Sequence, residues 1–314
     1  MGSEMCIRDS PYLVEAADIF LPNRTNSVCN VPEMTKGSQP TDGGYLLLSN
    51  KEKVNLITQE PEAKSWIKPF VGAEEFINNK PRWCLWLKGI QPTELKHLPM
   101  VLKRIEQVKT VRLASPKADT VKWASFPNLF TEDRQPKNNY LLVPSVSSER
   151  RKYIPIGFMH PDTIASNLCL MISEATLYHF GVLSSGMHMA WVRSVCGRLK
   201  SDYRYSAGIV YNNFPWPQAQ TDKQKQAIED AAQAVLDARA QFPDASLADL
   251  YDPLTMPEAL TKAHQKLDAA VDSAYAKRKF TGDSDRVAFL FELYQQITSP
   301  LESKKVTRRK RARA

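Results

Sequence analysis

The chain changes character at Trp216-Pro217, and this change constrains the fold more than any other feature of the sequence. Before this point, short apolar runs are bounded by Pro, Asn, Gly or Ser, which is typical of strands. After it, apolar residues recur at helical spacing. The pattern predicts an α+β chain, in which a mixed α/β domain is followed by a small all-α helical domain.

The first region is expected to contain short strands and a few helices. Leu95, Leu98, Leu102 and Ile105 predict a helix over 93–108, and residues 163–197 also look helical, in one or two pieces. The glycines and Asp in the segment GSQPTDGG (37–44) predict turns with positive φ. The runs that predict strands are 45–48, 83–87, 140–143, 154–158 and 207–211.

The second region predicts three amphipathic helices. The first begins at a capping box, Thr221 to Gln224, and the second is expected to begin at another, Thr255 to Glu258. The third lies within 287–297 and is expected to stop before Pro300. We find no internal repeat.

The net charge of +8 is concentrated at the C-terminus, where seven of the last eleven residues are Lys or Arg. Such a tail attracts polyanions without choosing a sequence, and residues 299–314 are otherwise expected to be a solvated, disordered end. The three predicted helices carry an excess of acidic residues, so they are not expected to bind phosphate by charge alone.

The motifs of common enzymes are absent from the sequence. It has no glycine-rich nucleotide loop, no nucleophile elbow and no zinc-type Cys/His spacing. The motif Glu-x-Lys, which some nucleases use, occurs three times, so a short match of this kind does not indicate a nuclease. The segment NNFPWP (212–217) faintly resembles the Asn-Pro-Pro-aromatic motif of amino-methyltransferases, but a rigid exit with Phe214 and Trp216 packed is favoured. We therefore expect neither catalytic residues nor a cofactor or metal site in this chain.

Two segments combine cations with hydroxyl and aromatic side chains. Residues 145–152 read SVSSERRK, and residues 188–205 hold four Arg or Lys, one His and three aromatics. Cations neutralise phosphates, Arg can also read guanine, and aromatics stack on bases. In the alternative interpretation, Trp191, Tyr203 and Tyr205 are core residues and the cations are ordinary surface.

Several blocks, taken in order, resemble the MmeI-like restriction–modification enzymes. These are long chains that combine a nuclease, an adenine-N6 DNA methyltransferase, a target recognition domain and a helical C-terminal domain. LDAAVDSAY (267–275) is similar to their C-terminal helices. The other blocks are GSQPTDGG (37–44), FINNKPRWCLWL (76–87), VPSVSSERRKYIPIGF (143–158), FGVLSSGMHMAWVRSVCGRLKSDYRYS (180–206) and YNNFPWP (211–217).

The resemblance implies that the chain corresponds to the C-terminal part of such an enzyme and recognises double-stranded DNA. The methyltransferase, its S-adenosylmethionine site and any nuclease are then expected upstream. A gene fragment is favoured over a stand-alone specificity protein. The expected division is a foreign segment left by cloning or assembly (1–10), the edge of the methyltransferase domain or a linker (11–36), a target recognition domain (37–217), a helical domain (218–298) and the basic tail (299–314).

The candidate DNA-binding residues come from the two cationic segments, which are expected to converge on one concave surface. A helix would place Met189 and Arg193 one turn apart, facing one groove. Each candidate could instead make a phosphate or structural contact without reading a base. The candidates are Ser147, Ser148, Arg150, Arg151, His188, Met189, Arg193, Arg198, Lys200 and Arg204.

A rival hypothesis from another class is a protein-interaction module whose tail adheres to polyanions. Neither hypothesis involves a membrane, because no apolar stretch approaches the ~20 residues that a spanning helix needs. Five cysteines without a C-x-x-C pair fit a reducing cytoplasm, where we expect the protein to act.

Overall fold

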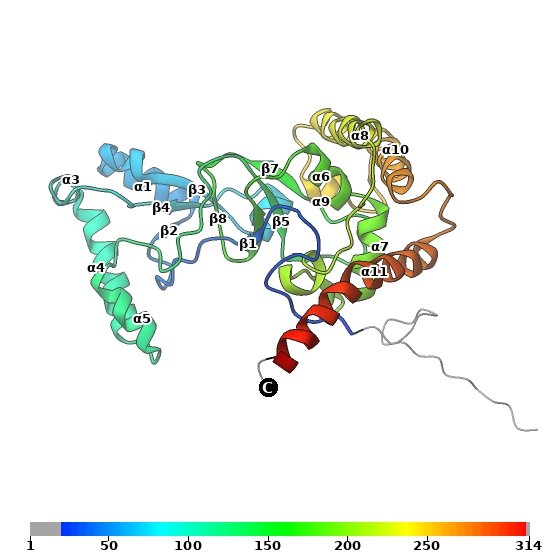
Figure 1. Cartoon of the computed structure of the whole chain (residues 1–314). Coiled ribbons are helices and arrows are strands. Elements are labelled where there is room, and N and C mark those ends of the chain that lie inside the picture. Colours follow the sequence, from blue (N-terminus) through cyan, green and yellow to red (C-terminus); the bar gives the residue numbers. More distant parts are fainter. Residues whose placement is uncertain (1–19, 312–314) are drawn as a thin grey trace, which may run out of the picture. The chain divides into compact units, whose positions relative to one another are not determined.

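The computed structural model describes the backbone of residues 20–311 and the side chains of residues 20–299 (Figure 1). The predicted foreign segment 1–10, and the first residues of the predicted linker, lie outside the described residues. The chain forms two compact units, each built from separate stretches of sequence. Among the described residues, the sheet unit comprises 35–144 and 157–174, and the helical unit comprises 20–34, 145–156 and 175–311.

The sheet unit contains two four-stranded sheets, with strand orders β1-β9-β5-β7 and β2-β4-β3-β8. The pairings of β2 with β4, β3 with β4, β5 with β7 and β5 with β9 are antiparallel, and β3 pairs parallel with β8. The strands are β1 (Met34–Lys36), β2 (Leu47–Leu48), β3 (Ile67–Val71), β4 (Trp83–Leu85), β5 (Tyr140–Pro144), β7 (Gly157–Met159), β8 (Ile164–Ala165) and β9 (Cys169–Ile172).

Helices α1 and α4 share one apolar core with the second sheet. Leu56 of α1 and Val101, Ile105 and Val108 of α4 join Cys84 of β4 in this core. Figure 1 shows α4 and α5 following one another. The helices are α1 (Asn50–Gln59), the 3₁₀ helix η1 (Pro61–Trp66), α2 (Ala73–Asn78), α3 (Pro92–Lys96), α4 (Pro99–Leu113), α5 (Ala118–Lys122) and the 3₁₀ helix η2 (Trp123–Ser125).

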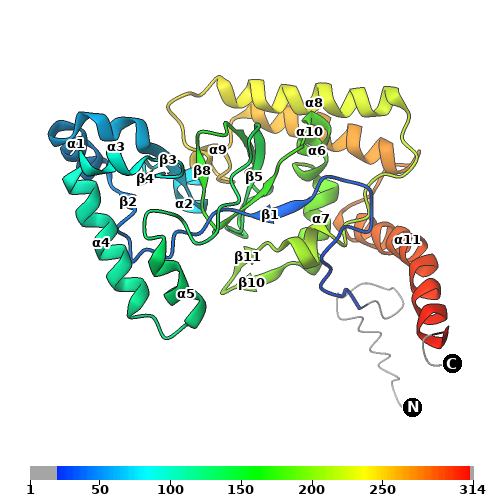
Figure 2. The same cartoon turned by 60° about the vertical axis from the view of Figure 1, so that its left-hand side comes forward.

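The helical unit joins helices from both sides of the composition change. The helices α8 and α10 run side by side (Figure 2), and α11 packs on α7. The elements are β6 (Val146–Ser147), α6 (Leu177–Leu183), α7 (Gly186–Val195), β10 (Gly197–Leu199), β11 (Asp202–Arg204), the π-helix η3 (Ala207–Tyr211), α8 (Asp222–Ala240), α9 (Leu247–Leu250), α10 (Glu258–Tyr275) and α11 (Asp283–Arg311).

Tertiary contacts override several predictions of secondary structure. The run 207–211 is a π-helix rather than a strand, closed by a hydrogen bond from Asn212 N to Ala207 O. The first part of 163–197 forms β8 and β9 rather than helix, because each finds a partner strand. The predicted helix 93–108 is two helices, α3 and α4, and the second begins at Pro99.

The helical domain matches its prediction more closely. The capping box at Thr221 is present, but α10 begins without a side-chain cap because the Thr255 hydroxyl donates to Asp249 O instead. The backbone of α11 stays helical to Arg311, past Pro300 and through the segment predicted to be a disordered tail. Lys and Arg are good helix formers, which favours this continuation.

Candidate nucleic-acid interface

The two cationic segments of the sequence meet in one three-stranded sheet. Strand β6 pairs antiparallel with β11, so that Ser147 lies opposite Tyr203 and Val146 opposite Arg204. A further hydrogen bond joins Tyr205 N to Ser145 O at 2.8 Å. Residues 56 to 60 positions apart in the chain therefore join one sheet, in the order β10-β11-β6.

The hairpin of β10 and β11 presents its cations to solvent. Its two-residue turn contains Lys200, which has a φ of 56°, and both Lys200 and Arg204 are exposed. Within the described residues neither forms an ion pair, so both are free to meet an anion. Arg198 is more constrained: its guanidinium lies 4.1 Å from the centroid of the Tyr203 ring and donates to Ser201 O at 2.9 Å.

The loop that follows β6 adds further cations to the same sheet. Arg150 is exposed and forms no ion pair among the described residues. Arg151 is half-buried, and its Nε has no hydrogen-bond partner there. Burial lowers the pKa of Arg151, while Asp202 and Asp252 oppose this shift. Ser148 is half-buried and caps the turn by accepting from Arg150 N at 3.4 Å.

Three predicted contact residues are buried in the unit, and these predictions need correction. Met189 is fully buried and His188 nearly so, because this face of α7 packs into the core rather than toward a groove. The His188 ring nitrogen Nε2 lies 2.9 Å from the Tyr205 hydroxyl. Ser147 is also buried, although its Oγ has no hydrogen-bond partner. Trp191, Tyr203 and Tyr205 are core residues, as the alternative interpretation proposed.

Arg193, near the end of α7, is half-buried, and its guanidinium binds other groups of the protein. It forms an ion pair with Asp283 at 2.7 Å and donates to the Lys152 carbonyl at 2.7 Å. It therefore supports the cationic loop rather than pointing with Met189 into one groove. Sequence reasoning missed this role because the partner Asp283 lies 90 residues away.

The NNFPWP segment is structural, as predicted. Asn212 donates to Arg24 O, and the fully buried Asn213 donates to three backbone carbonyls, including Pro22 O at 2.9 Å. Phe214 and Trp216 are both buried. The two amides thus tie the N-terminal segment to η3 and are occupied by the protein's own backbone.

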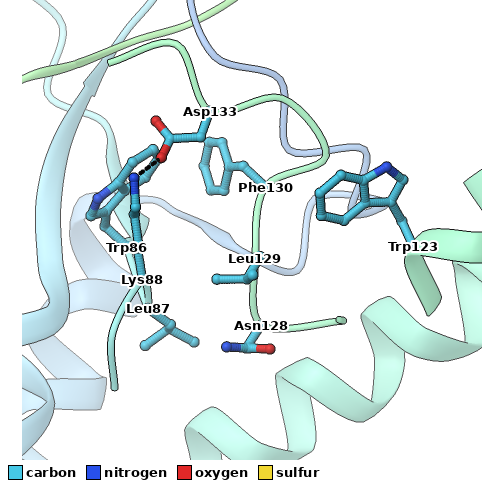
Figure 3. A pocket seen from close by; sticks show the side chains of 8 residues that line it. All are labelled: Trp86, Leu87, Lys88, Trp123, Asn128, Leu129, Phe130 and Asp133. Atoms are coloured by element: carbon cyan, nitrogen blue, oxygen red, sulfur yellow. Dashed lines mark hydrogen bonds and ion pairs between the residues drawn. The ribbon is translucent and has the colours of Figure 1, made fainter. Parts of the chain in front are cut away.

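The sheet unit contains a mainly apolar pocket, unlike the cationic surface described above (Figure 3). Aromatic and aliphatic side chains wall it, and Trp86 contacts the ring of Phe130 edge-on. Lys88, the cation at its edge, is paired with Asp133 at 2.5 Å. The pocket does not suit an anion, and it offers no free carboxylate for ribose hydroxyls. Its lining residues are Trp86, Leu87, Lys88, Trp123, Asn128, Leu129, Phe130 and Asp133.

The described part of the chain lacks two kinds of feature. No group of three or more His, Cys, Asp or Glu side chains there could hold a metal ion. No helix there is both long and apolar enough to cross a bilayer.

Comparison with known proteins defines the class to which this fold and surface belong. Residues 15–218 match the family model of the MmeI target recognition domain. Residues 220–302 match the family model of the MmeI C-terminal domain. The boundary between the two matches falls at the composition change after Trp216-Pro217. The chain therefore belongs to the MmeI family, through its target recognition and C-terminal domains, which confirms the resemblance seen in the sequence.

Two particular relatives each match 92% of this chain. DNA methyltransferase A of Bacillus subtilis (strain 168) is 43% identical over 289 residues, which are 92% of this chain and 33% of that protein. A solved structure of the Type IIL restriction–modification enzyme MmeI in complex with DNA matches with a TM-score of 0.89 and 48% identity, over 92% of this chain and 38% of that one. The chain thus spans about a third of the length of these relatives.

Proposed function

We propose that this chain recognises a specific site in double-stranded DNA through the sheet β10-β11-β6 and the loop after β6. The observation that supports the proposal is the pairing of β11 with β6, which joins the hairpin that carries the exposed Lys200 and Arg204 to the segment that leads into the exposed Arg150. Two-stranded ribbons fit the major groove, where each base pair presents a distinct pattern of donors and acceptors. The solved MmeI relative, which is bound to DNA, supports this assignment.

Within this surface the candidates differ in what they can contact. Lys200 and Arg204 are exposed side chains on the hairpin and are proposed to reach base edges or phosphates. We propose phosphate contacts for the remaining candidates of this surface, Ser148, Arg150, Arg151 and Arg198. The guanidinium of Arg198 already stacks on the Tyr203 ring, which limits its reach toward a base. We no longer assign Ser147, His188 or Met189 to DNA, because they are buried.

The recognition module is proposed to direct methyl transfer that is carried out elsewhere in a longer protein. The curated relative is a DNA methyltransferase, and this chain corresponds to a third of it. S-adenosylmethionine is accordingly proposed to bind a catalytic domain outside the matched third, in the cytoplasm. The pocket around Trp86 is lined mainly by apolar side chains, and its carboxylate Asp133 pairs with Lys88.

Binding to DNA can be measured directly on the full chain. Duplexes with a randomised central segment are passed over the immobilised protein, the retained pool is sequenced, and affinities for the selected and a scrambled duplex are measured by fluorescence anisotropy. We expect a defined site, with affinity falling steeply between ~50 and 200 mM salt as counterions are released. A pool that stays random after several rounds contradicts the proposal.

Variants separate the hairpin from other surface cations. Arg204→Ala is expected to weaken binding to the selected duplex by about tenfold, and to reduce the salt slope by ~1 if it contacts a phosphate. Lys223→Ala, an exposed cation at the start of α8, is the control and should leave both quantities unchanged. Equal effects of the two variants would show that charge alone, and not the hairpin, controls binding.

The rival interaction module is tested by removing residues 304–314. If the tail alone attracts polyanions, the truncated chain loses all affinity for DNA, and the proposal fails. If the hairpin surface binds, the selected duplex is still preferred over the scrambled one, with a lower overall affinity.

A further inference from the structure

We propose that the C-terminal helical region positions the DNA-facing loop 148–153, with Asp268 of α10 and Asp283 of α11 as positioning residues. The inference rests on the proposed function and deepens it. The loop belongs to the same compact unit as these helices, although in sequence it interrupts the sheet unit. It therefore needs anchors that its own sequence neighbours do not supply.

The first anchor is the carboxylate of Asp268. It accepts a hydrogen bond from the Tyr153 hydroxyl at 2.7 Å and another from Gly186 N at 2.7 Å. Tyr153 ends the cationic loop, and Gly186 is the first residue of α7, which leads toward the hairpin. One side chain of α10 thus connects the end of the cationic loop to the start of the helix that precedes the hairpin.

The ring of Tyr153 is held as firmly as its hydroxyl. It is almost fully buried and stacks on His264 of α10, with the ring centroids 4.0 Å apart. His264 is itself held in place, because its Nε2 lies within hydrogen-bonding distance, 2.8 Å, of the Tyr251 hydroxyl. Tyr153 therefore has no freedom to move without breaking contacts within the helical region.

The second anchor lies one residue earlier in the loop. The guanidinium of Arg193 donates to the Lys152 carbonyl at 2.7 Å, and its other nitrogen pairs with Asp283 at 2.7 Å. Asp283 is the first residue of α11. The start of α11 therefore fixes Arg193, and Arg193 fixes the backbone of the loop.

Rigid placement of the loop matters more for choosing a sequence than for attraction to DNA. Hydrogen bonds to base edges require their donors within about 0.5 Å of the productive geometry. Attraction to phosphates falls slowly with distance and tolerates displacement. Loosening the loop should therefore reduce discrimination between duplexes while leaving affinity for a scrambled duplex almost unchanged.

The experiment uses the full chain and two matched variants. Tyr153→Phe removes the hydroxyl that binds Asp268 and leaves the stacked ring in place. Tyr275→Phe, at the end of the same helix, removes a hydroxyl that donates to Pro215 O at 2.9 Å and touches neither DNA-facing segment. Affinities for the selected and the scrambled duplex, their salt slopes and the melting temperature are measured for both.

For Tyr153→Phe we expect the ratio of affinities for the selected and scrambled duplexes to fall about tenfold, as for loss of one hydrogen bond to a charged group. The salt slope should stay constant, and Tyr275→Phe should keep the wild-type ratio even if its melting temperature falls as far. Equal ratios for the two variants would overturn the inference, as would an unchanged ratio in Tyr153→Phe. If the wild-type chain selects no site, the proposed function fails instead, which distinguishes the two.

Discussion

Arg193 and Asp283 form an ion pair at 2.7 Å that links the end of α7 to the first residue of α11. Both side chains are partly exposed, so the pair itself contributes about 0–1 kcal/mol, and the bond to the Lys152 carbonyl contributes more. We expect Arg193→Ala to lower the free energy of unfolding by about 1–2 kcal/mol. Chemical denaturation of the full chain measures this change.

The same variant decides between two roles for Arg193. If it supports the loop, Arg193→Ala weakens discrimination at every position of the selected site and does not change the preferred base at any one of them. If it reads a base, as the sequence suggested, preference is lost at a single base pair with a cost of ~1–3 kcal/mol. Repeating the selection with the variant shows which pattern holds.

His188 makes stability depend on pH. Burial lowers the pKa of His188 from 6.5 to about 3. Between these two pH values its imidazole stays neutral in the folded protein, whereas it takes up a proton in the unfolded chain. The stability that this neutral histidine supports is present above pH 6.5 and is lost as pH falls toward 3. From pH 7 to pH 5 the loss should be about 2 kcal/mol for this residue.

Denaturation of wild type and His188→Gln at pH 7 and pH 5 measures the effect. At pH 5 the variant is expected to take up about one proton fewer on unfolding than the wild type, so its free energy of unfolding falls less between pH 7 and pH 5. An unchanged sensitivity in His188→Gln would falsify the assignment.

The sequence predicted the α+β architecture and the meeting of the two cationic segments better than it predicted which candidate side chains are buried. Helical periodicity and the cap at Thr221 are local, so α8 and α10 were predictable to within a few residues. The burial of Met189 depends on which face of α7 is covered, and a helix in the core is apolar on several sides. The division into units was not predictable, because loop 145–156 joins helices more than 100 residues away.

Arg112 is a fully buried cation, and the residues around it in the sequence do not indicate this burial. Its guanidinium donates five hydrogen bonds to backbone carbonyls of two loops, including Thr41 O at 2.9 Å and Leu129 O at 2.7 Å. Lys has three donors and no planar fork, so Arg112→Lys leaves carbonyls unpaired at about 1–3 kcal/mol each. We expect a total loss of about 3 kcal/mol in denaturation experiments, against less than ~0.5 kcal/mol for the exposed control Lys109→Ala.

Two glycines of the segment 37–44 serve different purposes, which a pair of alanine variants separates. Gly43 and Gly44 have positive φ, as predicted, but Gly37 is required by space: a Cβ there would lie 2.2 Å from Ser166 O. That oxygen belongs to the backbone, which cannot yield as a flexible side chain would. At Gly44, which has a φ of 91°, a Cβ meets nothing within 4 Å.

Gly37→Ala is therefore expected to cost about 3 kcal/mol through displacement of the adjoining backbone. Gly44→Ala should cost only the ~1–2 kcal/mol of left-handed backbone strain. Urea denaturation of the two variants gives the comparison. Because both changes add the same methyl group, a larger loss at Gly44 would show that turn geometry, and not the close approach of Ser166, determines the glycine at each end of this segment.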